Sequence, residues 1–282
     1  MGLGHLSTEG AREDRGSIDR LPTAELVRLM NEDDQAVPLA VAEAGAQIAQ
    51  AVDAIAERLR QGGRLIYAGA GSAGRIGRLD ASECGPTFNT DRVLAVCADS
   101  DAAEDDYDAG ALDLPTVTAR DAVVGISASG RTPYVLGAIE QARRANALTI
   151  GLACNAGSEL SAAVEIAIEV LVGPEFIAGS TRLKAGTAQK LVLNMLSTLT
   201  MVRLGKTYGN LMVDVRVTNA KLRDRATRIV EQVSGASHED AAAALQAAGD
   251  EARVAIVMLK RGIGPDEARS LLETLPLRDA TH

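Results

Sequence analysis

The stretch LIYAGAGSAG, from Leu65 to Gly74, joins a short apolar run to a glycine-rich loop. The apolar run is typical of a buried strand, and Arg75, Ile76 and Leu79 follow it at helical spacing. Glycine lets a backbone approach a ligand closely, and the free N–H groups at the start of a helix bind anions. The stretch therefore predicts a strand, a phosphate-binding turn and a helix.

Two further stretches have the same character. SASGRT, residues 127–132, follows an apolar run and places three hydroxyls around Gly130, and GSTR, residues 179–182, leads into helix-forming sequence. Loops that follow parallel strands meet at the carboxyl edge of a sheet. The three stretches together predict that one small phosphorylated molecule binds at this edge.

Apolar runs alternate with helical segments through the middle of the chain. The predicted strands are residues 64–68, 93–98, 121–126, 148–153 and 166–172; the predicted helices begin near 74 and cover 133–145, 158–163 and 180–204, with 101–112 helical or irregular. Strands joined by such crossovers indicate an α/β fold with a five-stranded parallel sheet sandwiched by helices.

The segments before and after this α/β region predict two further parts of the molecule. Residues 1–60 read as a loosely held polar arm, a short helix that Thr23 could cap, and a helix over 39–60, all packing on a core domain of residues 61–218. Residues 213–217 are ambiguous between a strand and an extended link. Residues 219–282 predict a small three-helix bundle, with Ser237 and Asp250 as caps and Pro265 in a first turn.

Composition excludes several classes of protein. The net charge of -9 argues against a broad nucleic-acid surface. The three cysteines fit neither a disulfide framework nor a zinc site, and no histidine cluster could bind a metal, so proton transfer would fall to carboxylates. No signal peptide is seen, and the longest apolar tract, residues 191–201, is too short to cross a membrane. We expect a soluble cytoplasmic protein.

Other interpretations of these residues remain open at this point. Residues 69–74 also satisfy the dinucleotide fingerprint, with Asp99 as the candidate ribose ligand, and the 127–132 loop could be a structural turn. Glu83, beside Cys84, would be partly desolvated, which favours the proton-donating form of a carboxyl, or it could be a satisfied carboxylate at a helix end. Lys184 could clamp a substrate or belong to a polar helix face.

The chain resembles the N-acetylmuramic acid 6-phosphate etherases, members of the sugar isomerase domain family. The resemblance covers nearly the whole chain. The stretches that match the family are Thr8-Glu9, Ile18-Asp19, LDASEC (79–84), ASGRTPYV (128–135), VGPE (172–175), GSTRLKAGTAQK (179–190), LNMLST (193–198) and GNLMVDV (209–215).

The resemblance implies a cofactor-free lyase that cleaves the D-lactyl ether of N-acetylmuramic acid 6-phosphate in cell-wall recycling. Water is consumed, the products are N-acetylglucosamine 6-phosphate and D-lactate, and the route is elimination followed by hydration. It also implies a homodimer with sites near the interface. Glu83 matches the proton donor and Glu104 the base; the implied substrate-binding residues are Ser72, Ser127, Ser129, Thr132, Ser180, Thr181 and Lys184.

The chain departs from the family pattern at three places. It has Gly71-Ser72-Ala73-Gly74 where the family usually reads Gly-Thr-Ser-Gly, and Gly85-Pro86 where the family has two prolines. The segment from Ala98 to Ala103 is also shorter than in the family, which bears on whether Glu104 reaches the site. The alternative is a sugar-phosphate-binding protein of the same fold that is non-catalytic or has altered specificity.

Overall fold

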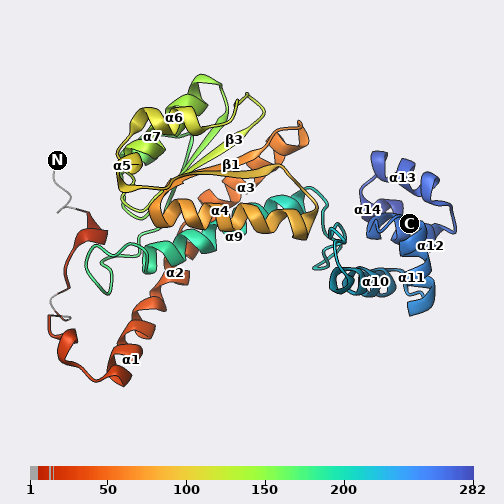
Figure 1. Ribbon diagram of the computed structural model, residues 1–282, viewed down its shortest axis with the longest axis horizontal. Coiled ribbons are helices and arrows are strands. Elements are labelled where there is room, and N and C mark those ends of the chain that lie inside the picture. The colour runs from red at the N-terminus through yellow and green to blue at the C-terminus, as the bar shows by residue number, and fades with distance from the viewer. Residues whose placement is uncertain (1–5, 13, 15) are drawn as a thin grey trace. The chain divides into compact units, whose positions relative to one another are not determined.

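The computed structural model describes residues 6–12, 14 and 16–282, and it divides into two compact units (Figure 1). The first unit contains the chain up to Ser82 together with Arg92–Thr200. The second contains Glu83–Asp91 and Met201–His282. Among the described residues, no helix combines the length and apolar character needed to cross a membrane.

The first unit is built on a parallel sheet, which confirms the predicted fold class. Its strands are β1 (Leu65–Ala70), β2 (Val93–Ala98), β3 (Ala122–Ser127), β4 (Leu148–Ala153) and β5 (Ile166–Glu169). Their order is β2-β1-β3-β4-β5, with every neighbouring pair parallel. The connections leave β1 and β3 in opposite directions across the sheet, so the loops after these two strands flank a crevice of the kind where α/β proteins bind ligands.

Helices cover both faces of this sheet. They are α1 (Thr23–Asp34), α2 (Ala36–Glu43), α3 (Gly45–Arg60), α4 (Gly71–Phe88), α5 (Asp101–Glu104), α6 (Tyr107–Asp113), α7 (Pro133–Arg144), α8 (Glu159–Ala163) and α9 (Lys184–Arg203), with 3-10 turns at Ser7–Glu9 and Ile18–Arg20. Figure 1 shows α6 and α7 on one side of the sheet and α4 and α9 on the other. Gly125 of β3 lies against Val135 and Ile139 of α7, and Gly77 of α4 lies against Tyr67 of β1.

The amino-terminal arm is held more firmly than the sequence predicted. Thr8 is fully buried, and its Oγ1 accepts a hydrogen bond of 3.0 Å from the side-chain amide of Asn155. The same amide donates to the carbonyl oxygen of Ala128 at 3.0 Å. The expectation of a loosely held arm is therefore wrong for this part of it, because Asn155 ties the arm to the loop after β3.

The second unit is helical, as predicted, with five helices rather than three. They are α10 (Ala220–Ser234), α11 (His238–Ala247), α12 (Ala252–Arg261), α13 (Pro265–Thr274) and α14 (Leu277–Ala280). Ser237 caps α11 and Pro265 opens α13, which confirms two predictions. Asp250 does not cap α12, because Glu251 holds the N-cap position. Val213 and Val215 are buried in this unit's core without forming a strand.

Candidate functional site

A cavity of about 500 Å³ lies at the carboxyl ends of β1 and β3, where the sequence predicted a ligand. It is lined by residues from the ends of both strands, from α4, α5 and α9, and from the amino-terminal arm. Its polar side chains are Glu9, Ser72, Arg75, Glu104, Asp105, Ser127, Ser129, Arg131, Thr132, Thr181 and Gln189.

The loop after β3 supplies a preformed cluster of hydroxyls. The Ser127 Oγ lies 2.9 Å from the Thr132 Oγ1 and 3.3 Å from the Ser129 Oγ, and it accepts the Gly130 N–H at 3.0 Å. Gly130 has a φ of +70°, and a Cβ there would lie 2.3 Å from Ser158. A side chain at residue 130 is therefore excluded, and the loop presents its hydroxyls in one compact group that suits a phosphate.

The first glycine-rich stretch brings a helix start directly to the cavity. Strand β1 ends at Ala70 and α4 begins at Gly71, whose φ is +53°. The strand therefore continues two residues beyond the predicted 64–68, and no loop separates it from the helix. The first N–H groups of this long helix, together with Ser72, lie at the cavity, where the helix dipole favours an anion.

Acidic side chains line the same cavity. Glu104 closes the short helix α5, which Ser100 caps by accepting the Ala103 N–H at 3.2 Å. A Cβ built on Gly71 would lie 3.5 Å from the Glu104 Oε2, so this carboxylate lies over the start of α4. The shortened segment before Glu104 therefore still brings it to the cavity. Glu9 also lines the cavity; its place in the Thr8-Glu9 stretch was the only sequence signal for it.

Three predicted site residues do not line this cavity. Ser180 lies in the turn before α9 and is not among the lining residues. The Lys184 side chain is buried and pairs with the Asp33 Oδ2 at 3.5 Å, so it belongs to the packing of α9 rather than to the ligand surface. Glu83 is exposed on α4. Its predicted desolvation is wrong, because Cys84 and Phe88 take the buried positions of that helix segment.

The dinucleotide interpretation fits the structure poorly. Both Asp99 oxygens accept hydrogen bonds of 2.9 Å from Arg78. These bonds lower the pKa of Asp99 and occupy the carboxylate that a ribose would need. Cysteine chemistry is also unfavourable, since burial raises the pKa of Cys154 to about 12. Within the described residues, no group of three or more His, Cys, Asp or Glu side chains is arranged to hold a metal ion.

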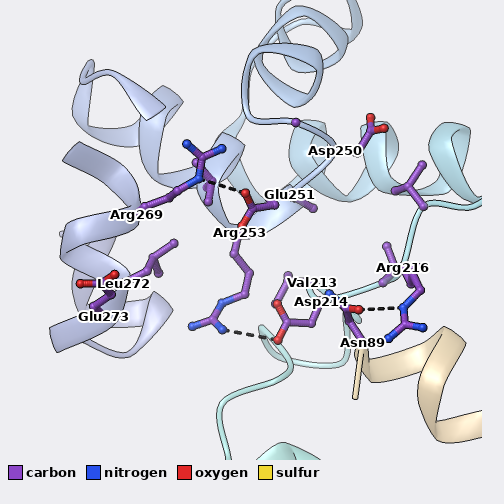
Figure 2. Close-up of a pocket in the computed structure, with 15 residues that line it drawn as sticks. Asn89, Val213, Asp214, Arg216, Asp250, Glu251, Arg253, Arg269, Leu272 and Glu273 are labelled. Atoms are coloured by element: carbon purple, nitrogen blue, oxygen red, sulfur yellow. Dashed lines mark hydrogen bonds and ion pairs between the residues drawn. The ribbon is translucent and has the colours of Figure 1, made fainter. Parts of the chain in front are cut away.

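A separate cavity of about 520 Å³ lies in the second unit (Figure 2). Four of its charged side chains form two pairs: Arg253 approaches Asp214 at 3.4 Å, and Arg269 donates to Glu251 at 3.0 Å. It contains no cluster of hydroxyls comparable to that after β3. The cavity at the sheet edge is therefore the better candidate for a phosphorylated ligand.

The fold and the hydroxyl-lined cavity define the class of protein as one built on a SIS domain. The SIS domain family matches residues 92–199, and the C-terminal lid domain of glucokinase regulatory protein matches residues 209–253. A solved phosphoheptose isomerase from Francisella tularensis is similar in fold, with a TM-score of 0.53 and 21% identity over 64% of this chain and 100% of that chain.

Relatives at high identity define the particular family. An N-acetylmuramic acid 6-phosphate etherase from Rubrobacter xylanophilus is 59% identical over 99% of this chain and 96% of its own. One from Streptomyces avermitilis is 56% identical over 95% of this chain and 91% of its own. The chain belongs to the N-acetylmuramic acid 6-phosphate etherase family, and the resemblance seen in the sequence is confirmed.

Proposed function

We propose that this protein cleaves the D-lactyl ether of N-acetylmuramic acid 6-phosphate, releasing D-lactate and N-acetylglucosamine 6-phosphate. The family membership supports the substrate and the reaction. The single structural observation that carries the proposal is the meeting of the hydroxyl cluster, the start of α4 and Glu104 in one cavity. That cavity can hold a phosphate beside a carboxylate.

The reaction needs a base and an acid. In the ring-opened sugar, the C1 carbonyl acidifies the C2 proton. Glu104 takes that proton, the C3–O bond breaks, and lactate leaves as the C2–C3 double bond forms, with a proton supplied to the leaving oxygen. Water then adds at C3 and a proton returns to C2. A carboxylate within reach of the substrate can provide such proton transfers.

We propose the phosphate ligands as Ser72, Ser127, Ser129, Thr132 and Thr181. Each of these hydroxyl-bearing residues lines the cavity. The N–H groups at the start of α4 add donors that do not depend on side chains. We assign Ser180 and Lys184 to supporting the start of α9, since Lys184 is already paired with Asp33.

We propose that Glu83 is the proton donor and that it acts in a homodimer. Glu83 and Leu79 are four residues apart on α4 and so share a helix face. Leu79 is exposed, as are Met195 and Leu199 of α9, which packs beside α4 through the ion pair of Lys190 with Asp80 at 2.7 Å. Exposed apolar side chains of this kind suit a subunit interface. If the two subunits meet on this face, Glu83 lies at their interface.

We also propose that the protein works in the cytoplasm. Its three cysteines, Cys84, Cys97 and Cys154, are free and buried. Free thiols without disulfides are typical of a reducing compartment.

The direct test is lactate release from purified protein. We expect stoichiometric D-lactate and N-acetylglucosamine 6-phosphate from N-acetylmuramic acid 6-phosphate, measured with a lactate dehydrogenase assay and mass spectrometry. In ¹⁸O-labelled water, elimination and hydration place the label in the sugar product and leave the lactate unlabelled. Binding of the substrate without any turnover would instead favour the alternative of a non-catalytic sugar-phosphate-binding protein.

A further inference from the structure

One side chain in the cavity has polar atoms without partners. Gln189 of α9 lines the cavity and is 1% exposed. Among the residues that the structure describes, neither its Nε2 nor its Oε1 has a hydrogen-bond partner. The next residue, Lys190, does have one, since its Nζ pairs with Asp80 at 2.7 Å.

Such a side chain is costly to the folded protein. A buried amide that loses its bonds to water without gaining others destabilises the fold, and buried polar groups in native proteins are therefore nearly always bonded. An orphaned donor and acceptor at the wall of a ligand cavity indicate that the ligand supplies the missing partners. Packing alone does not explain Gln189, because an apolar side chain of the same size would fill the space without that cost.

The donor and acceptor atoms of the amide limit which chemical groups of a ligand Gln189 can bind. Carboxylates such as Glu9 and Glu104 only accept hydrogen bonds when ionised, and guanidinium groups such as Arg131 only donate. The Gln189 amide offers a donor and an acceptor on two separate atoms. It is complementary to a ligand that presents an acceptor and a donor on neighbouring atoms of its skeleton.

We propose that Gln189 recognises the 2-acetamido sugar, an inference that rests on the proposed function. Its Oε1 accepts the acetamido N–H at C2, and its Nε2 donates to the oxygen at C1. These two groups sit on adjacent carbons of the sugar. Gln189 is thus a specificity-determining residue, and by holding C1 and C2 it also positions the C2 proton for the base.

The test compares two stable ligands in binding experiments that need no turnover. N-acetylglucosamine 6-phosphate carries the acetamido group, and 2-deoxyglucose 6-phosphate has neither donor nor acceptor at C2. We expect the wild-type protein to bind the first about tenfold or more tightly than the second in calorimetry. In Gln189→Met this preference should disappear. N-acetylglucosamine 6-phosphate loses both bonds to the amide, whereas 2-deoxyglucose 6-phosphate loses only the bond at C1 and therefore loses less affinity.

A second readout separates recognition from a structural role. Removing two unsatisfied buried atoms should leave the melting temperature of the ligand-free Met variant equal to or above that of wild type. Gln141→Met, at an exposed position on α7, is the matched control and should change neither affinity nor melting temperature. If the Met variant does not fold, Gln189→Leu removes the same donor and acceptor with another apolar side chain and should abolish the preference in the same way.

Several outcomes would overturn the inference. They are an unchanged preference in the variants, an equal loss of affinity for both ligands, or a lower melting temperature with the preference intact, which would mean that an internal water satisfies the amide. Lactate release by the wild-type protein is measured separately, as the test of the proposed reaction. Absence of lactate with the binding preference present would count against the proposed reaction while leaving the role of Gln189 standing.

Discussion

At the scale of single residues, the position of Glu104 depends on a few local interactions. Ser100 caps α5, and the Glu104 carboxylate lies beside Gly71 at the start of α4. An ionised carboxylate is the form that a general base requires.

Replacing Glu104 by Gln should therefore remove the base with little change in shape. We expect kcat for lactate release to fall by a factor of about 10² to 10⁴. The affinity for N-acetylglucosamine 6-phosphate should persist, because the hydroxyl cluster is untouched. Asp108→Asn, an exposed position on α6, is the control and should retain full activity. A Glu104→Gln variant with normal kcat would remove Glu104 from the mechanism.

Local sequence was sufficient to place some of these residues at the cavity but not others. Ser127 and Thr132 were correctly placed because their loop follows a buried strand, and the end of a parallel strand is a predictable location. Lys184 was placed wrongly because its partner, Asp33, lies on a distant helix. Gln189 was missed because its distinguishing property is the absence of partners, which only the packed structure reveals.

At the scale of elements, α6 and α7 pack with their backbones in close approach. A Cβ on Gly110 of α6 would lie 1.8 Å from the Tyr134 carbonyl oxygen, and one on Gly137 of α7 would lie 1.9 Å from that of Tyr107. The two glycines thus make reciprocal contacts between the helices. Because α5 directly precedes α6, this contact also fixes the segment that carries Glu104.

Gly137→Ala should force the two helices apart. We expect a loss of about 1–3 kcal/mol in the free energy of unfolding, measured by urea denaturation. Gly45→Ala is a matched control at the start of α3, where nothing lies within 4 Å of the added Cβ. It should be neutral or stabilise the protein by up to about 1 kcal/mol. If the two substitutions change the free energy of unfolding equally, the close approach of α6 and α7 does not contribute to stability.

The strands were predictable as elements and the helix limits less so. Strands β1, β3 and β4 are fully buried apolar runs, and β2 and β5 are short, mainly apolar and partly buried. The start of α9 was predicted at Ser180, a residue type that often caps helices, but the helix begins at Lys184. The reason is a distant cap: the buried Glu175 carboxylate accepts the N–H groups of Lys184 and Ala185 at 2.9 and 3.0 Å.

At the scale of the whole molecule, the proposed homodimer gives a test that does not depend on a complex structure. If Glu83 serves the site of the partner subunit, a dimer of one Glu83→Gln chain and one Glu104→Gln chain contains one complete site. Random exchange of the two inactive variants should then restore about a quarter of the wild-type activity. Light scattering would establish the dimer, and either variant mixed with itself is the control. If Glu83 instead serves its own subunit, no activity returns.

The buried amino-terminal turn has a practical consequence. Thr8 is fully enclosed and Glu9 forms part of the cavity wall, with Asn155 linking the arm to the loop after β3. A shortened protein that begins after Gly10, of the kind designed for crystallisation, would lack the part of the cavity wall that Glu9 forms. Affinity tags are accordingly better appended to the carboxyl end.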